Sequence, residues 1–241
     1  MIVTIYHILG RLFRLFPKQT RIKCLNMEAS FFVPINCHYV CDDLSEIADG
    51  TREPKLYEWL NDIAHNSIFF DVGTNYGQEV ALVSSFIDAN ITVVGFDCNL
   101  YHSHFCCLNK ALNNDRFSFV FAAVADKSGQ TVTIKTNSDT HIRHLHKKNV
   151  PYSYDVLTIA LDEYAKRNKL MPTHLKIDVD GAEDLVIKGA SSFMSNKMLR
   201  GIFIEIDNKN KKLKNTILKY GFEVVWEEQK QTNTDILFRR I

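Results

Sequence analysis

Residues 67–79 read SIFFDVGTNYGQE. The apolar run at 68–70 is rich in strand-forming residues and is typical of a central strand buried on both faces of a sheet. Asp71 ends the run, and a glycine-containing turn leads into Gln78, where we expect a helix to begin. A strand, a glycine turn and a helix bring backbone N–H groups and the positive helix end to the carboxyl edge of a sheet. In α/β proteins this arrangement forms a ligand-binding crevice.

The spacing of the glycines indicates which ligand the crevice takes. Gly73 and Gly77 stand four residues apart, with Asn75 where the dinucleotide fingerprint has another glycine. A second apolar strand, residues 91–96, ends at Asp97, twenty residues after Gly77. A carboxylate at the tip of the second strand can accept hydrogen bonds from both ribose hydroxyls of a nucleoside. A nucleoside site without a pyrophosphate cradle favours S-adenosylmethionine (SAM) over NAD.

Several motifs follow one another along the chain. They are FDVGTNYG at 70–77, the strand end at Asp97, NKALN at 109–113, Ala123 ahead of DKSG at 126–129, LD at 161–162 and KIDVDGAE at 176–183. In this order, from about residue 53 to residue 205, the chain resembles FkbM-type methyltransferases. These are class I SAM-dependent enzymes, mostly O-methyltransferases acting on sugars or natural products. Thr74, Asp97-Cys98 and Asp180 stand where the family usually has alanine, Glu-Pro and glutamate.

The resemblance implies an α/β fold with a Rossmann-like, seven-stranded, mostly parallel sheet, helices on both faces, and SAM as cofactor. The expected cofactor-binding residues are Asp71, Gly73, Asn75, Gly77, Asp97, Ala123 and Asp178. We expect Asp97 to hold the ribose and Asp71 to orient the methionine end, directly or through water. The alternative for Asp71 is a cap of the following turn.

Alternation in the fourth strand predicts Lys176, Asp178 and Asp180 on one face. Asp178 is the best candidate to orient the acceptor hydroxyl or to take its proton, and we expect Lys176 to pair with Asp178 or Glu205. The alternative is a structural network of these charges tying neighbouring strands together. The absence of any Pro-Pro pair, part of the signature of many N-methyltransferases, favours oxygen as the acceptor atom.

The segment 137–155 is locally basic and carries three histidines, of which we take His144 as the third catalytic candidate. In the methyltransferase fold this insertion overhangs the active site. It could form a lid that recognises a phosphate or carboxylate on the acceptor, with a histidine as base. The alternative is a solvated loop with incidental charge.

Strands and helices alternate along most of the chain, which is typical of a mainly parallel sheet. We predict strands near 68–72, 91–97, 117–123, 173–179, 201–206, 222–227 and 234–240, helices at 78–88, 101–113, 157–168, 182–197 and 208–220, and a small hairpin or edge structure at 31–40. A further helix is predicted to start near Pro54.

Length and composition fit one catalytic domain. The 241 residues divide into an N-terminal extension, 1–50, and a methyltransferase domain, 51–241. A net charge of +1 argues against a dedicated nucleic-acid partner, so we expect a small-molecule or glycan acceptor. The six cysteines show no framework spacing, which predicts reduced thiols, a cytoplasmic location and no zinc or other metal site. The rival functions are a non-catalytic partner module on the same fold and an NAD-dependent oxidoreductase.

The first 16 residues are apolar on one helical face, and five basic residues precede the first acid, Glu28. One interpretation is a helix that lies on an anionic membrane, with residues 1–23 making peripheral contact at its inner face. The interpretation we favour is a helix packed on the domain or on a second subunit of a homo-oligomer.

Overall fold

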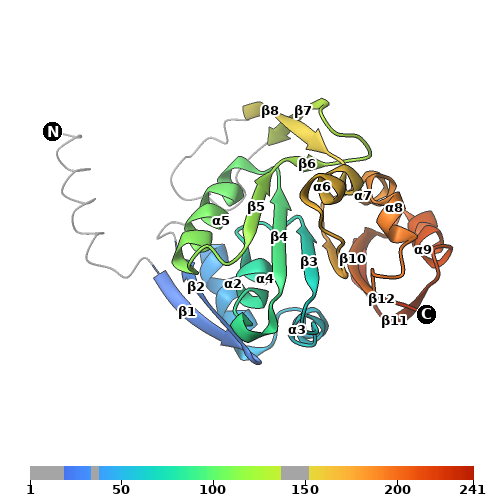
Figure 1. Cartoon of the computed structure of the whole chain (residues 1–241). Coiled ribbons are helices and arrows are strands. Elements are labelled where there is room, and N and C mark those ends of the chain that lie inside the picture. The colour runs from blue at the N-terminus through green and yellow to red at the C-terminus, as the bar shows by residue number, and fades with distance from the viewer. Residues whose placement is uncertain (1–18, 34–37, 137–151) are drawn as a thin grey trace.

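The structure is a computed structural model that describes residues 19–33, 38–136 and 152–241 (Figure 1). In chain order the elements are β1 (Gln19–Cys24), β2 (Met27–Phe32), α2 (His38–Asp49), α3 (Pro54–Asn61), β3 (Ile68–Val72), α4 (Gln78–Val83), η1 (Ile87–Ala89), β4 (Thr92–Asp97), α5 (Leu100–Leu112), β5 (Ser118–Phe121), β6 (Ala123–Val124), β7 (Thr131–Thr136), β8 (Tyr152–Ile159), α6 (Leu161–Asn168), β9 (His174–Ile177), α7 (Glu183–Gly189), α8 (Ser191–Met194), β10 (Gly201–Asp207), α9 (Lys211–Leu218), β11 (Phe222–Gln229) and β12 (Asn233–Arg240).

The seven-stranded sheet has the order β11-β12-β10-β9-β3-β4-β5. Strand β3 lies in the middle and pairs in parallel with both β4 and β9, whereas β12 runs antiparallel to β10 and β11. The predicted seven-stranded, mostly parallel sheet is confirmed, and its last strand, β12, is antiparallel to both neighbours. Because β3, β4 and β9 are parallel, their carboxyl ends meet at one edge, and Asp71 lies beside both Gly95 and Lys176.

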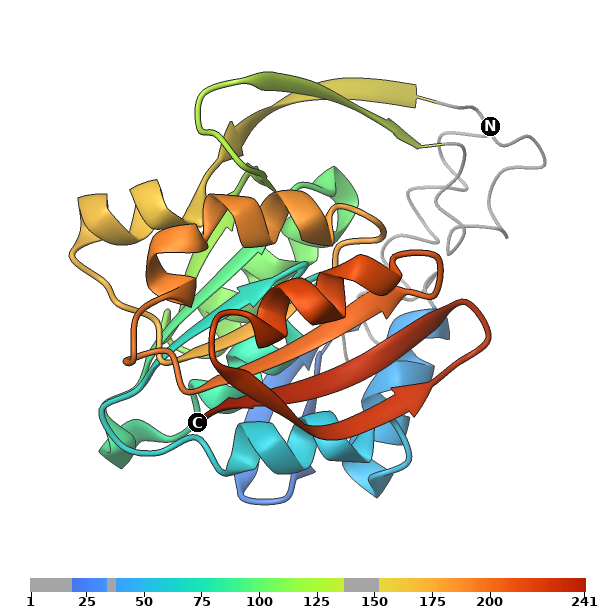
Figure 2. The ribbon, with the colours of Figure 1, turned by 90° about the vertical axis from the view of Figure 1, so that its right-hand side faces the viewer.

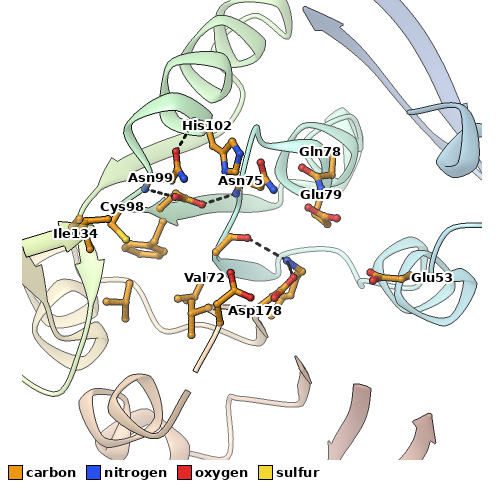
Figure 3. Close-up of a pocket in the computed structure, with 18 of the residues that line it drawn as sticks. Glu53, Val72, Asn75, Gln78, Glu79, Cys98, Asn99, His102, Ile134 and Asp178 are labelled. Carbon is orange, nitrogen blue, oxygen red and sulfur yellow. Dashed lines mark hydrogen bonds and ion pairs between the residues drawn. The ribbon is translucent and has the colours of Figure 1, made fainter. Parts of the chain in front are cut away.

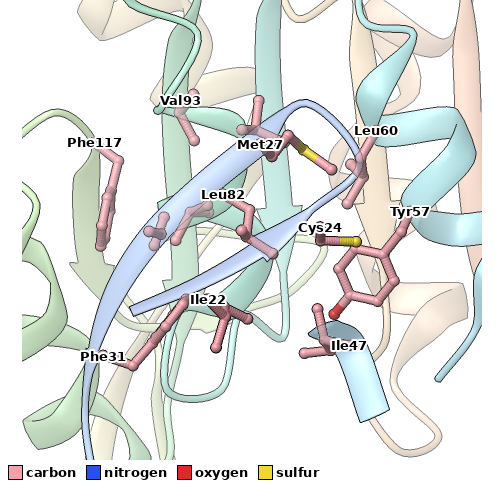
Figure 4. Packing of buried hydrophobic residues seen from close by; sticks show 14 of the residues in the cluster. Ile22, Cys24, Met27, Phe31, Ile47, Tyr57, Leu60, Leu82, Val93 and Phe117 are labelled. Carbon is pink, nitrogen blue, oxygen red and sulfur yellow. The ribbon is translucent and has the colours of Figure 1, made fainter. Parts of the chain in front are cut away.

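Helices cover both faces of this sheet, as predicted, and the two cores alternate along β3. Phe69 belongs to the core beneath the β1–β2 hairpin, α2, α3 and α4, whereas Phe70 belongs to the core beneath α6, α7, α8 and α9. Figure 4 shows the first of these, in which Ile22 and Met27 of the hairpin lie among side chains of the helices and of β4. An all-apolar strand such as 68–70 can therefore be buried on both sides.

The hairpin predicted at 31–40 is wrong in position. The antiparallel hairpin is β1–β2, and Cys24 pairs with Met27 across a turn in which Leu25 has φ of 54°. The described residues of the predicted segment end β2 and begin α2 instead. In both strands of the β1–β2 hairpin, buried residues alternate with more exposed ones. This alternation is the feature of the sequence from which the hairpin could have been predicted.

The helix predicted at 157–168 is wrong in its first four residues. Strand β8 pairs with β7 up to Leu157 and with β6 at Thr158 and Ile159, and α6 begins only at Leu161. The long helix predicted at 182–197 is divided into α7 and α8 at Ala190. The helix predicted to start near Pro54 is confirmed as α3.

Strands β7 and β8 form the main part of a second, three-stranded sheet with the order β6-β8-β7. Figure 2 shows this hairpin arching above the helices at one end of the molecule. The N-terminal helix, His144 and most of the proposed lid lie outside the described residues, so those predictions stay predictions. Within the part of the chain that is described, no helix is both long and apolar enough to cross a membrane.

Candidate functional site

A cavity of about 650 Å³ opens at the shared carboxyl edge of β3, β4 and β9. Its walls come from the turn after β3, the first turn of α4, the end of β4, the segment after β9 and the inner face of β7 (Figure 3). Four of the predicted cofactor-binding residues, Gly73, Asn75, Asp97 and Asp178, line it. The crevice that residues 67–79 predict is therefore present, and strand β7 adds a wall that the sequence analysis did not expect.

The glycine turn is possible only with glycine at two positions. Gly73 has φ of +83°, and a Cβ there would lie 1.7 Å from the backbone oxygen of Asp178. Gly77 has φ of +85°, and a Cβ there would lie 2.9 Å from Sγ of Cys106. Gly77 does not line the cavity itself, but its N–H donates to the oxygen of Thr74 at 2.8 Å and closes the turn. Both residues thus shape the cavity through the backbone.

Asp97 joins the tip of β4 to the turn after β3. Its Oδ2 accepts from the N–H of Asn75 at 2.8 Å, and its Oδ1 accepts from the N–H of Asn99 at 2.6 Å (Figure 3). Burial raises the pKa of Asp97 to about 6, although both backbone hydrogen bonds lower it. Each carboxylate oxygen has a further lone pair, so the side chain can still accept from a ligand in the cavity.

Asp71 lies behind the turn and not on the cavity wall. It is fully buried, accepts from the Thr74 hydroxyl at 2.7 Å, and pairs with Nζ of Lys176 at 3.3 Å. Any contact of Asp71 with a ligand would therefore have to run through neighbouring groups. Its hydrogen bond to Thr74 corresponds to the alternative that the sequence analysis left open, a cap of the turn.

Lys176 is buried between three acids. Besides Asp71, its Nζ lies 3.8 Å from Asp178, and Glu79 contributes to its electrostatic surroundings. Burial lowers the pKa of Lys176, but Asp71, Glu79 and Asp178 outweigh it and hold the pKa well above its ordinary value. Of its two predicted partners, Asp178 is present, whereas Glu205 lies 3.8 Å from Lys230 instead. Lys176 is thus a fixed positive charge beneath the cavity.

Two buried polar residues at the start of α4, Gln78 and Glu79, were not among the predicted site residues. Glu79 is 2% exposed; its Oε1 accepts from the Tyr57 hydroxyl at 3.0 Å, and its Oε2 has no hydrogen-bond partner among the described residues. Oε1 of Gln78 is likewise buried and has no hydrogen-bond partner among the described residues. Both residues line the cavity, and burial raises the pKa of Glu79 to about 7. Their place directly after Gly77, at the crevice, is the signal that could have found them.

The remaining site predictions fall beside the cavity or outside the described residues. Ala123 does not line the cavity, but its neighbours Ala122 and Val124 do. His102, which follows Asp97 in the chain, also lies in the wall. His144 is not among the described residues.

Comparison with known proteins identifies the family. A model described as the methyltransferase FkbM domain matches residues 71–224. The chain belongs to this family. No curated protein sequence matches this FkbM-family chain. The assignment rests on the family match and agrees with the strand order of the sheet.

Solved methyltransferase structures are similar to this FkbM-family chain only distantly. Fibrillarin from Aeropyrum pernix, in complex with SAM, is 11% identical, with 73% of this chain and 67% of that chain covered and a TM-score of 0.48. TrmK from M. capricolum, in complex with S-adenosylhomocysteine, is 9% identical over 76% of this chain and 66% of that chain, with a TM-score of 0.44. Precorrin-6y C5,15-methyltransferase from Geobacter metallireducens is 12% identical over 78% and 86%, with a TM-score of 0.46.

Proposed function

We propose that this FkbM-family chain is a SAM-dependent O-methyltransferase that acts on a hydroxyl of a sugar, a glycan precursor or another natural product. The observation that carries the proposal is the pairing of Asp97 with the glycine turn at the mouth of a cavity. A carboxylate held there by two backbone N–H groups, with lone pairs left for a ligand, suits the two ribose hydroxyls of a nucleoside.

The other walls of the cavity suit the remaining parts of SAM. Phe96, Val124 and Ile134 provide apolar surface for a flat base. Glu79 and Gln78 provide buried acceptor oxygens that lack partners among the described residues, and such groups are costly unless a ligand donates to them. The amino group of the methionine moiety is a donor of this kind. When bound, SAM supplies a methyl group on a positively charged sulfur.

Asp178 is the residue that we assign to the acceptor. Its side chain is 42% exposed, lines the cavity, and is held from behind by Lys176 at 3.8 Å. A carboxylate in this position can orient a hydroxyl and accept its proton, which lowers the barrier to attack by oxygen. The absence of a Pro-Pro pair in the chain supports oxygen over nitrogen as the acceptor atom.

Isothermal titration calorimetry of the full chain with SAM, S-adenosylhomocysteine and NAD tests the cofactor. We expect the first two to bind and NAD not to bind. Binding of NAD without SAM would support an oxidoreductase and overturn the proposal.

A transfer assay with radiolabelled methyl-SAM and a panel of sugars and hydroxylated natural products tests the reaction. Label is expected in a methyl ether that resists mild base, which distinguishes it from a methyl ester. A chain that binds SAM but labels no hydroxyl compound in the panel would instead support the non-catalytic partner module.

A further inference from the structure

Three acids converge beside the cavity from two neighbouring strands. Asp178 and Asp180 follow β9, and Glu205 lies near the end of β10, next to it in the sheet. One carboxylate oxygen from each lies within 4.8 Å of the other two. Three carboxylates at this separation repel one another unless a cation lies between them.

A fourth, buried acid faces the same place. Asp235 on β12 is the antiparallel partner of Glu205, and its side chain is 3% exposed. Its Oδ2 pairs with Lys230 at 2.6 Å, but its Oδ1 has no hydrogen-bond partner among the described residues. Asp235, Glu205 and Asp178 line one small cavity of about 10 Å³ together with Glu53 and Lys176, and its volume is enough for a single water molecule or ion; Asp180 does not line it. A buried carboxylate oxygen of this kind needs a donor or a cation.

The nearby lysines neutralise this cluster only in part. Lys230 lies 3.8 Å from Glu205, beyond hydrogen-bond distance, and closer to Asp235 and Glu53 at 2.6 and 3.2 Å. Lys176 likewise lies 3.8 Å from Asp178 and closer to the buried Asp71 at 3.3 Å. Asp180 forms no ion pair with any described residue. Each lysine is thus held mainly by an acid outside the triad.

We propose that Asp178, Asp180 and Glu205 bind a divalent cation that prefers oxygen ligands, such as Mg²⁺ or Mn²⁺. All three ligands are carboxylates, and cysteine or histidine ligands are absent from the cluster, which is the donor set of hard cations. Oδ1 of Asp235 would accept from a water molecule in the cation's coordination shell. Cysteine spacing, on which the expectation of no metal rests, does not reveal this cluster, because Glu205 meets Asp178 and Asp180 only through the pairing of β9 with β10.

The position of the cation would connect it to the acceptor. Asp178 and Asp180 both line the large cavity, and Asp178 also lines the small one, so the cation would lie at the edge of the large cavity with coordination positions open towards it. This second part rests on the proposed function: a hydroxyl of the acceptor, or two neighbouring hydroxyls, would complete the coordination. The substrate class that fits is then a sugar or another compound with adjacent oxygen atoms.

Titration with Mn²⁺ tests the site directly. The full chain, freed of metal with EDTA and dialysed, is titrated at pH 8 and free Mn²⁺ is followed by electron paramagnetic resonance. We expect one saturable site per chain with a dissociation constant below about 1 mM, the weak end for carboxylate sites in proteins, and competition by Mg²⁺. Absence of saturable binding would overturn the proposal.

Three variants locate the site. Asp180→Asn and Glu205→Gln are each expected to weaken Mn²⁺ binding at least tenfold. Asp88→Asn, an exposed acid in η1 at the opposite edge of the sheet, makes the same charge change and should bind as the parent does. Equal binding in all three variants would place the ion elsewhere. Asp180 is exposed, so its variant carries the test if Glu205→Gln does not fold.

The two proposals fail in different ways. SAM titration of the same samples is expected to give similar affinities with and without Mn²⁺, because Asp97 and Glu79 lie outside the triad and Asp178, although predicted among the cofactor-binding residues, is assigned here to the acceptor. A chain that binds SAM but not Mn²⁺ would overturn the metal site alone. A chain that binds Mn²⁺ at the triad but not SAM would overturn the proposed function and leave the site in place.

Discussion

Removal of the Asp97 carboxylate separates cofactor binding from folding. In Asp97→Ala the N–H groups of Asn75 and Asn99 lose their acceptor, which costs about 1–3 kcal/mol each where water cannot replace it. The buried carboxylate carries an opposing cost. A pKa raised from 3.8 to about 6 makes the ionised form roughly 3 kcal/mol less stable in the fold than in the unfolded chain. The net change in the free energy of unfolding at pH 7 therefore lies between a gain of about 1 and a loss of about 3 kcal/mol.

The effect on SAM binding should be large by comparison. Hydrogen bonds from the ribose to a charged acceptor contribute about 1.5–3 kcal/mol, so Asp97→Ala should weaken SAM and its demethylated product about ten- to a hundredfold. Asp97 also sets a pH dependence. Only the ionised carboxylate accepts from both hydroxyls, so the affinity of the parent chain should fall as the pH drops below about 6. The variant should not show this fall.

Calorimetry with S-adenosylhomocysteine between pH 5 and pH 8, together with thermal melts of the same samples, measures both effects. Asp88→Asn serves as the control for a surface charge change. An affinity in Asp97→Ala within twofold of the parent, in a folded protein, would refute the assignment of Asp97 to the ribose. The same pH dependence in the variant would assign the titration to another group.

Three further predictions concern the turn and the buried charges. Glu79→Gln should flatten the pH dependence of stability. The folded chain keeps a proton on Glu79 that the unfolded chain loses, so Glu79 should contribute a fall of roughly 3 kcal/mol to the parent's free energy of unfolding between pH 4.5 and about 7, and the variant should lack this part of the slope in denaturant titrations; an unchanged slope would contradict this. Gly73→Ala should cost more than about 3 kcal/mol by the same method, because the Cβ meets the oxygen of Asp178. Gly50→Ala, with φ of +78° but nothing within 4 Å, should cost only about 1–2 kcal/mol, and equal losses would show that φ alone decides. Asp178→Asn should leave SAM affinity within about threefold but lower turnover by roughly 10²–10⁴ in the transfer assay; loss of SAM binding or of folding would favour the structural network instead.

The parts of the fold that can be predicted from the sequence are those written in local pattern. An apolar run followed by a polar residue marks a buried strand and its carboxyl end, and parallel pairing brings such ends together. The pattern alone therefore places Asp97 and Asp178 at one crevice, where both line the cavity. Gly73 and Gly77 are equally readable, because the turn after β3 needs their positive φ values.

The parts that could not be predicted depend on pairing between distant segments. Glu205 and Asp235 lie opposite each other only because β12 joins the sheet antiparallel to β10 in one register. Lys176 has acids on several sides, and its closest ion-pair partner is Asp71 because β3 and β9 place the two residues side by side. The end of strand β8 runs into α6 with only Ala160 between them, and its strand conformation depends on pairing with β6 and β7, which are distant in the sequence.

The charges of the cavity wall restrict the acceptor further. Two of its cations already hold acids: Lys176 pairs with Asp71, and Arg52 pairs with Asp43 at 2.8 Å. Among the described residues that line the cavity, the remaining side chains include five carboxylates and one lysine, Lys135. Even with a divalent cation held by Asp178 and Asp180, the wall keeps the carboxylates of Glu53, Glu79 and Asp97, and a phosphate or carboxylate on the acceptor would be repelled by these three. We infer that a neutral hydroxyl compound is the acceptor class that this wall favours, since it can donate to the carboxylates and adds no negative charge.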